Sequence, residues 1–427
     1  MLSVIRYLER GEDPARNLAS NSSNDESWFK PRGMGQHDHR SAVFVPTFRI
    51  IGNMKFKINV IYITSSIVIF LIWTYGAQTE LAKRRESGTG EGTSRRIDID
   101  MGNMWRSVSG MVDGTVPLPF IKRRLLVDSA LILANVIPDS FWLSLKNAIH
   151  GDSWLQCQLA KLLEESGWER EHYPLLFSAY FLIWLSTLGF LYGSRCFSLT
   201  QFEMTPATAT AIGAILGIGL LGGFGSWNEY PNDIPNAFFF LLTLTAIVLK
   251  RWWLWLAFVA AAYSKETSVL LIFAYLLLNW DSSRSLRFWI TVVGLGLIFL
   301  MIQLWMQYRF SNLPPGPVFW YPLRNLQILL KGAIGGCWYL SIVAVAVARM
   351  VRMRPMIPQD LRRLVLLVPV MVGLAFFKGW VEERRAYYEV YPLLGLIVIQ
   401  WATLELGWER YLVPKNVLRG EAIGSEP

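Results

Sequence analysis

Two aspartates, Asp98 and Asp100, have the type and spacing best suited to acid–base chemistry. In the segment RRIDIDMG they are two positions apart, so they share a face of an extended segment but not of a helix. A carboxylate here can take the proton of a sugar or lipid hydroxyl, or hold a divalent cation such as Mg²⁺ or Mn²⁺. We predict that one of the two is catalytic and that any bound metal lies at this pair. Solvent-exposed carboxylates are the simpler alternative.

Further charged residues form the predicted substrate-binding set. An arginine guanidinium binds phosphate through two parallel hydrogen bonds, whereas a lysine ammonium acts as a point charge. The charged flanks that membrane helices ordinarily carry are the alternative, and an aspartate at a helix start is equally suited to a cap. The candidates are Arg123, Arg124, Glu229, Asp233, Lys265, Glu266, Glu383, Arg384 and Arg385.

Lys265 and Glu266 stand side by side in an apolar run that extends from about Trp252 to Trp280. A charged residue at the centre of a membrane helix costs roughly 2.5 to 3.5 kcal/mol. Such residues therefore tend to line a cavity or to lie where the helix reaches the membrane surface. The pair is expected at the outer ends of two short membrane spans.

The composition predicts a membrane protein. Of 427 residues, 53% are hydrophobic and only 17% are charged, against about 25% charged in soluble domains. Several uncharged stretches of about 18 to 23 residues are long enough to cross a hydrocarbon core. The net charge of +9 is then assigned to cytoplasmic loops and lipid headgroups, and no nucleic-acid partner is expected. We predict an all-α integral membrane protein with about ten transmembrane helices.

The polar and apolar stretches divide the chain into three parts. Residues 1–50 are predicted to be a disordered cytoplasmic tail, 51–410 the polytopic membrane domain, and 411–427 a second cytoplasmic tail. Within the membrane domain, 77–172 is expected to be a long first extracytoplasmic loop with interfacial amphipathic helices, one from Leu125 to Ile137. The spans are expected to begin near Phe56, Leu175, Thr205, Ala237, Trp252, Thr267, Phe288, Leu326, Leu364 and Tyr388.

The basic residues predict the orientation of these spans. If both termini are cytoplasmic, the inner loops hold Arg195, Lys250–Arg251, Arg284, Arg287 and the basic segment 348–363, as the positive-inside rule requires. The candidate substrate-binding residues then all lie on the extracytoplasmic side of the plasma membrane. Their gathering on one side predicts a single polar cavity there.

Three segments together resemble the polytopic GT-C-type glycosyltransferases of bacteria. IDIDMGNMWRSVSGMVDGTVPLPFIKRRLLVD is similar to the family's first periplasmic loop, in which an acidic residue follows the first span. The pair NDIP and AAYSKETSVLLI resembles a DxP…KE segment across the middle spans, and EERRAYYEVYPLL resembles the late outer loop. These segments occur in the family's order between residues 98 and 392.

The resemblance implies a helical membrane fold, a catalytic cavity on the outer face, and inverting transfer from a polyprenyl-phosphate sugar. Asp98 or Asp100 would be the base or the metal partner, while Arg124, Lys265 and Arg384 would bind the lipid phosphate. The acceptor would be a glycan, a lipid or a protein. Four residues separate Asp100 from Trp105, where the family often has an aromatic residue close to its aspartate, so the choice between the two aspartates stays open.

Other functions compatible with the sequence are a polysaccharide polymerase or ligase that uses a lipid-pyrophosphate donor, a transporter or lipid flippase, and a non-catalytic scaffold subunit. Transporters place charges near the bilayer midplane on broken helices and show internal repeats. The two halves of this sequence show no repeat, and the charges are expected at span ends. Glycosyl transfer is therefore the preferred hypothesis.

Overall fold

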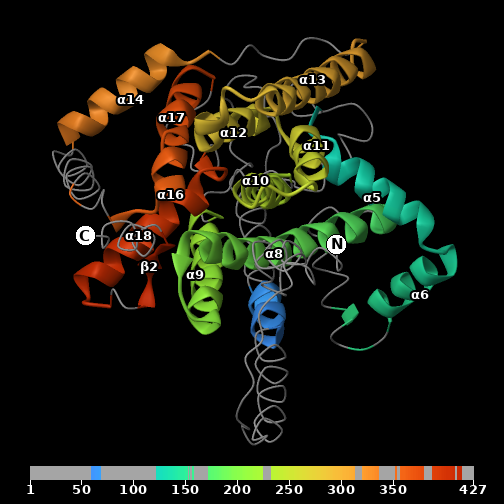
Figure 1. Cartoon of the computed structure of the whole chain (residues 1–427). Coiled ribbons are helices and arrows are strands. Elements are labelled where there is room, and N and C mark those ends of the chain that lie inside the picture. The colour runs from blue at the N-terminus through green and yellow to red at the C-terminus, as the bar shows by residue number, and fades with distance from the viewer. Residues whose placement is uncertain are drawn as a thin grey trace, which may run out of the picture. The chain divides into compact units, whose positions relative to one another are not determined.

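The computed structural model describes residues 59–68, 122–151, 153, 156–157, 172–224, 232–312, 320–335, 352, 356–378, 387–408 and 411–415. These residues are mostly helical (Figure 1). The chain divides into two compact units, 1–60 and 61–427, and the helices from Leu125 onward belong to the second. Of the predicted site residues, Asp98, Asp100, Glu229, Glu383, Arg384 and Arg385 lie outside the described residues, as does the predicted tail 1–50.

One described helix covers Asn59–Val68, and the labelled helices and turns follow it along the chain. They are α5 (Leu125–Val136), α6 (Asp139–Ile149), α8 (Tyr173–Gln201), α9 (Pro206–Phe224), α10 (Asp233–Val248), α11 (Leu254–Ser264), the 3-10 turn η3 (Glu266–Val269), α12 (Leu270–Asn279), the 3-10 turn η4 (Trp280–Ser282), α13 (Leu286–Arg309), α14 (Pro322–Gly335), α16 (Gln359–Leu364), α17 (Leu367–Lys378) and α18 (Tyr391–Glu405).

Among the described residues, two helices are long and apolar enough to cross a membrane, namely α8 with 29 residues and α13 with 24. The spans predicted near Leu175 and Phe288 are thereby confirmed as long apolar helices. A third crossing is reached if α5 and α6, which meet at a bend of 99°, form one broken span. Pro138 lies at this bend and precedes the first residue of α6.

The count of about ten spans is not supported by the described residues. Five of the predicted spans are apolar helices of 10 to 17 residues, shorter than the roughly 20 that a straight crossing needs. Their helical ladders stop inside apolar sequence. After α10 the helical backbone is broken at Lys250, whose φ is 52°. The backbone of Lys265 is extended between α11 and η3. A hydropathy average over about 20 residues does not detect such breaks, so it predicts longer helices than the backbone forms.

The centre of the fold is α8, which packs along α5, α9 and α10 (Figure 1). Three of its hydroxyl groups are satisfied within the helix, because Ser186, Thr187 and Ser198 each donate to a carbonyl one turn earlier. Gly189 lets α10 approach closely, since a Cβ at that position would lie 2.6 Å from the Phe238 ring. Helices α5 and α10, which carry Asp128 and Asp233, are thus packed closely against α8.

Other elements connect the periphery to this centre. The strand β1 (Phe202–Glu203) pairs antiparallel with β2 (Val413–Pro414), which joins the residues after α8 to those after α18. Helix α13 is capped by Ser285, which precedes its first residue and whose hydroxyl accepts from the Phe288 backbone N–H. Most of its apolar side chains are exposed, Met301 at 68% among them. A long helix with such a surface is suited to contact with lipid.

Candidate functional site

A buried cluster of charges forms where α11 ends. Lys265 interrupts the helix, and its ammonium Nζ lies 2.8 Å from Oε1 of Glu389 and 3.8 Å from Oδ1 of Asp233. Asp233 is the first residue of α10, and Glu389 lies two residues before α18. Lys265 is 8% exposed, Glu389 0% and Asp233 1%. Three distant segments therefore meet through one ammonium group.

Glu389 is the centre of the cluster. Besides the lysine, its Oε1 accepts hydrogen bonds from the Asn236 side-chain amide at 3.0 Å and from the Thr267 hydroxyl at 2.6 Å. Asn236 is three residues after Asp233, so both lie on one face of α10. With three donors on a single oxygen, the geometry matches an ionised carboxylate.

Moving such ions out of water costs several kcal/mol each, and only close pairing offsets that cost. One ammonium faces two carboxylates here, so the formal charge of the cluster is one negative unit if both acids are ionised. The ion pairs therefore stabilise the Lys265 cluster, but its own side chains leave a net negative charge.

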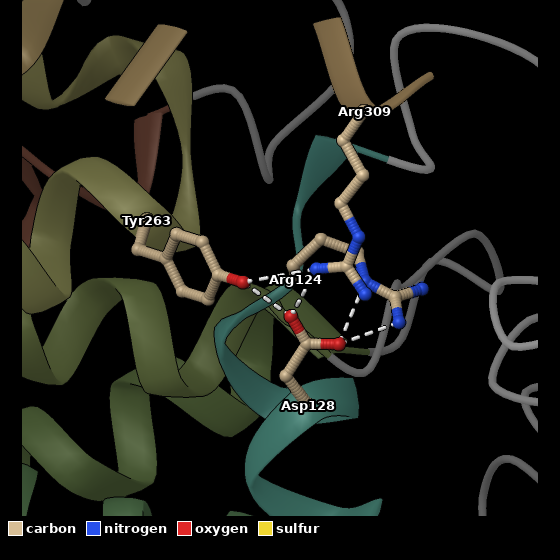
Figure 2. A network of polar contacts seen from close by, with 4 residues as sticks. All are labelled: Arg124, Asp128, Tyr263 and Arg309. Carbon is tan, nitrogen blue, oxygen red and sulfur yellow. Dashed lines mark hydrogen bonds and ion pairs between the residues drawn. The ribbon is translucent and has the colours of Figure 1, made fainter. Parts of the chain in front are cut away.

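A second network surrounds Asp128 in the first turn of α5 (Figure 2). Its Oδ1 accepts from the Arg124 Nε at 2.9 Å, one helical turn earlier. Its Oδ2 accepts from Arg309 Nη1 at 2.9 Å and from the Tyr263 hydroxyl. These contacts join α5 to the last turns of α11 and α13. One carboxylate thereby holds two guanidinium groups close together.

Aromatic rings support these guanidinium groups. Arg309 lies over the Trp305 ring at 5.2 Å and the Phe310 ring at 5.4 Å, and Arg124 lies over Phe310 at 5.7 Å. These are distances at which a cation is attracted to the ring face. Tyr263 stacks on Trp305 with ring centroids 5.6 Å apart. Arg124 is buried, whereas the Arg309 side chain is 36% exposed.

Arg123 and Glu266 connect the two networks along the chain, since Glu266 follows Lys265. The Arg123 Nε lies 3.4 Å from Glu266 Oε2. Burial alone would raise the pKa of Glu266, but the charge of Arg123, a backbone hydrogen bond and the ammonium of Lys265 outweigh it and lower the pKa below its ordinary 4.5. The carboxylate is therefore ionised at neutral pH.

This lowered pKa predicts the direction of a pH effect on stability. A carboxylate with a lowered folded-state pKa stabilises the fold above its ordinary pKa, and this contribution is lost as the pH falls through the folded-state value. We expect Glu266→Gln to flatten the decline in melting temperature below about pH 4.5. Melting curves of both proteins between pH 7 and pH 3 check this; parallel curves would contradict it.

Five predicted site residues lie in the described part of the chain, and the structure brings them into one region: Arg123, Arg124, Asp233, Lys265 and Glu266. Each of the three basic residues contacts a carboxylate, a pairing that was not predicted for any of them. The remaining six lie outside the described residues, so the structure does not place them.

The structure adds functional candidates that the sequence interpretation did not choose: Asp128, Asn236, Tyr263, Thr267, Arg309 and Glu389. Two had a local signal, because Asp128 follows Arg124 by four residues and Asn236 follows Asp233 by three. Arg309 ends an apolar helix and had no signal of its own.

Among the described residues, no group of three or more histidine, cysteine, aspartate or glutamate side chains is arranged to hold a metal ion. The predicted Mg²⁺ or Mn²⁺ pair, Asp98 and Asp100, lies outside them.

No family model matches the chain, and neither a curated protein nor a solved structure matches it. The resemblance to GT-C enzymes thus rests on the three sequence segments alone.

Proposed function

We propose that the protein is a membrane glycosyltransferase that moves a sugar from a polyprenyl-phosphate donor to a glycan, lipid or protein acceptor. It would act at the extracytoplasmic face of the plasma membrane, with both termini cytoplasmic and additional crossings made by the shorter helices. The observation that carries the proposal is the convergence of Arg124 and Arg309 on Asp128, beside Arg123. A phosphate-bearing lipid needs such a group of cations as its leaving-group site.

In this proposal an aspartate takes a proton from the acceptor, and the basic side chains stabilise the leaving phosphate. Asp98 or Asp100 takes the proton of the acceptor hydroxyl, whose oxygen attacks the anomeric carbon while the bond to the phosphate oxygen breaks. The lipid phosphate leaves with the bonding electrons and gains negative charge. Basic side chains near it stabilise that charge more in the transition state than in the bound donor.

Arg309 is the cation best placed to meet a phosphate. Its side chain is one-third exposed, and only Nη1 of its guanidinium contacts the carboxylate and the phenol. Asp128 has a positioning role in this proposal. The guanidinium groups of Arg124 and Arg309 repel each other, and the carboxylate of Asp128 holds them together before the donor binds.

The test is a turnover assay on the purified full-length protein in lipid, with polyprenyl-phosphate and polyprenyl-pyrophosphate sugars as donors and free lipid phosphate as the readout. We expect release from one donor class, reduced at least tenfold in either Asp98→Asn or Asp100→Asn. Asp281→Asn, at a solvent-exposed ion pair with Arg363, is the matched control and should retain activity. Full activity in both aspartate variants would contradict the assigned base.

A second candidate function, a transporter or flippase, is favoured by one observation. The charges of Lys265, Asp233 and Glu389 lie at a break in an apolar helix, as the ion sites of many transporters do. The two candidates separate in vesicles: movement of lipid or solute without sugar release from any donor would reject glycosyl transfer and support transport.

A further inference from the structure

The Lys265 cluster contains more acceptor oxygens than its donors serve. Six buried oxygen atoms of its residues and their neighbours have no hydrogen-bond partner among the described residues: Asp233 Oδ1 and Oδ2, Asn236 Oδ1, Ser264 Oγ, Ser268 Oγ and Glu389 Oε2. Their residues are at most 1% exposed. A buried carboxylate oxygen without a partner is costly, so this concentration of acceptors requires a positive ligand or a donor.

We propose that these oxygens bind one dehydrated alkali-metal cation, such as Na⁺ or K⁺. Two carboxylates and one ammonium leave one negative charge, which a monovalent cation neutralises. Carboxylate, amide and hydroxyl oxygens are the ligands that hard cations prefer. A divalent ion would leave one positive charge unbalanced beside the Lys265 ammonium, so a monovalent ion is the better match.

The geometry also selects the size of the ligand. Asp233, Asn236 and Glu389 are almost wholly inaccessible, so a sugar or a phosphate does not fit between them. The two carboxylates nevertheless share one region, because Asp233 Oδ1 faces the same ammonium that Glu389 Oε1 contacts. We therefore expect the ligand to be an ion without its hydration shell.

The backbone adds to the attraction. Helix α11 ends at Ser264, and the carbonyl end of a helix carries partial negative charge. Broken helices whose carbonyl ends help to coordinate Na⁺ are a recurrent arrangement in membrane proteins. Lys265 then fixes Glu389 while the opposite side of the cluster binds the ion. The inference is independent of the choice between glycosyl transfer and transport.

The test measures binding and stability of the purified full-length protein in detergent. Equilibrium binding of ²²Na⁺, competed with unlabelled NaCl or KCl, is expected to give one saturable site per chain. NaCl or KCl should also raise the melting temperature above that in choline chloride at equal ionic strength, because a ligand that binds the folded state stabilises it.

Asp233→Asn keeps the shape of the side chain but removes the unbalanced charge, so saturable binding and the specific rise in melting temperature should both be lost. Asp281→Asn, the exposed control, should bind like the wild type. Unchanged binding in Asp233→Asn would overturn the proposal. The proposal would also be overturned if the wild-type protein showed no saturable Na⁺ site and its melting temperature responded equally to sodium and choline. If that melting temperature nevertheless responded to pH, the ligand would be a proton. The wild-type measurement decides even if the variant does not fold.

Discussion

Lys265→Met is expected to lower the free energy of unfolding by about 3 to 5 kcal/mol, the usual effect of removing one partner of a buried ion pair. Methionine fills a similar volume, so the loss comes mainly from charge. Glu389 and Asp233 would remain buried as two carboxylates without their ammonium partner, and like charges at short distance in a low dielectric repel strongly.

The measurement is denaturant unfolding of the purified protein in detergent, followed by tryptophan fluorescence. A double variant, Lys265→Met with Glu389→Gln, should recover part of the loss because it also removes the charge left without a partner. Asp281→Asn is the control, since its ion pair with Arg363 is exposed and should contribute no more than about 1 kcal/mol. A Lys265→Met loss as small as that of the control would show that the cluster is not a stabilising ion pair.

Asp128→Ala is expected to destabilise the protein by about 2 to 3 kcal/mol, in the range of lost hydrogen bonds to charged groups. Arg124 is 3% exposed and would keep a buried charge without this acceptor, while Arg309 and Tyr263 would lose their common partner. The contact that joins α5 to α11 and α13 would be lost with it.

A double-mutant cycle separates this network from general damage to α5. We expect Asp128→Ala and Arg309→Met to be strongly coupled, whereas Asp128→Ala and Asp281→Asn, which share no partner, should be additive. Tyr263→Phe keeps the ring on Trp305 and removes only the hydroxyl, so its effect should be smaller than that of Asp128→Ala. Additivity of Asp128→Ala with Arg309→Met would contradict the network drawn in Figure 2.

The two networks have different meanings for function. The Asp128 network holds a partly exposed arginine near other cations, which suits a ligand that arrives from outside. The Lys265 cluster is buried, so it suits a structural role or the small-ion site proposed above. Their closest link is the segment Tyr263–Glu266, in which consecutive residues serve one network or the other.

Some of these features were determined by the sequence alone. Long uncharged stretches predict the apolar helices α8 and α13, because hydropathy over about 20 residues depends on composition and not on packing. The position of Lys265 and Glu266 within an apolar run was sufficient to mark the place where both networks meet, since a charge there is costly unless it has a specific environment.

Only the tertiary structure decided what that environment is. Asn236 and Glu389 are 153 positions apart, and Arg309 and Asp128 are 181 apart, so no local pattern relates them. The structure also showed that α11 ends at Ser264 and that the described residues give two or three membrane crossings rather than about ten. A helix break and an ion-pair partner are both set by packing between distant segments, which the local sequence does not encode.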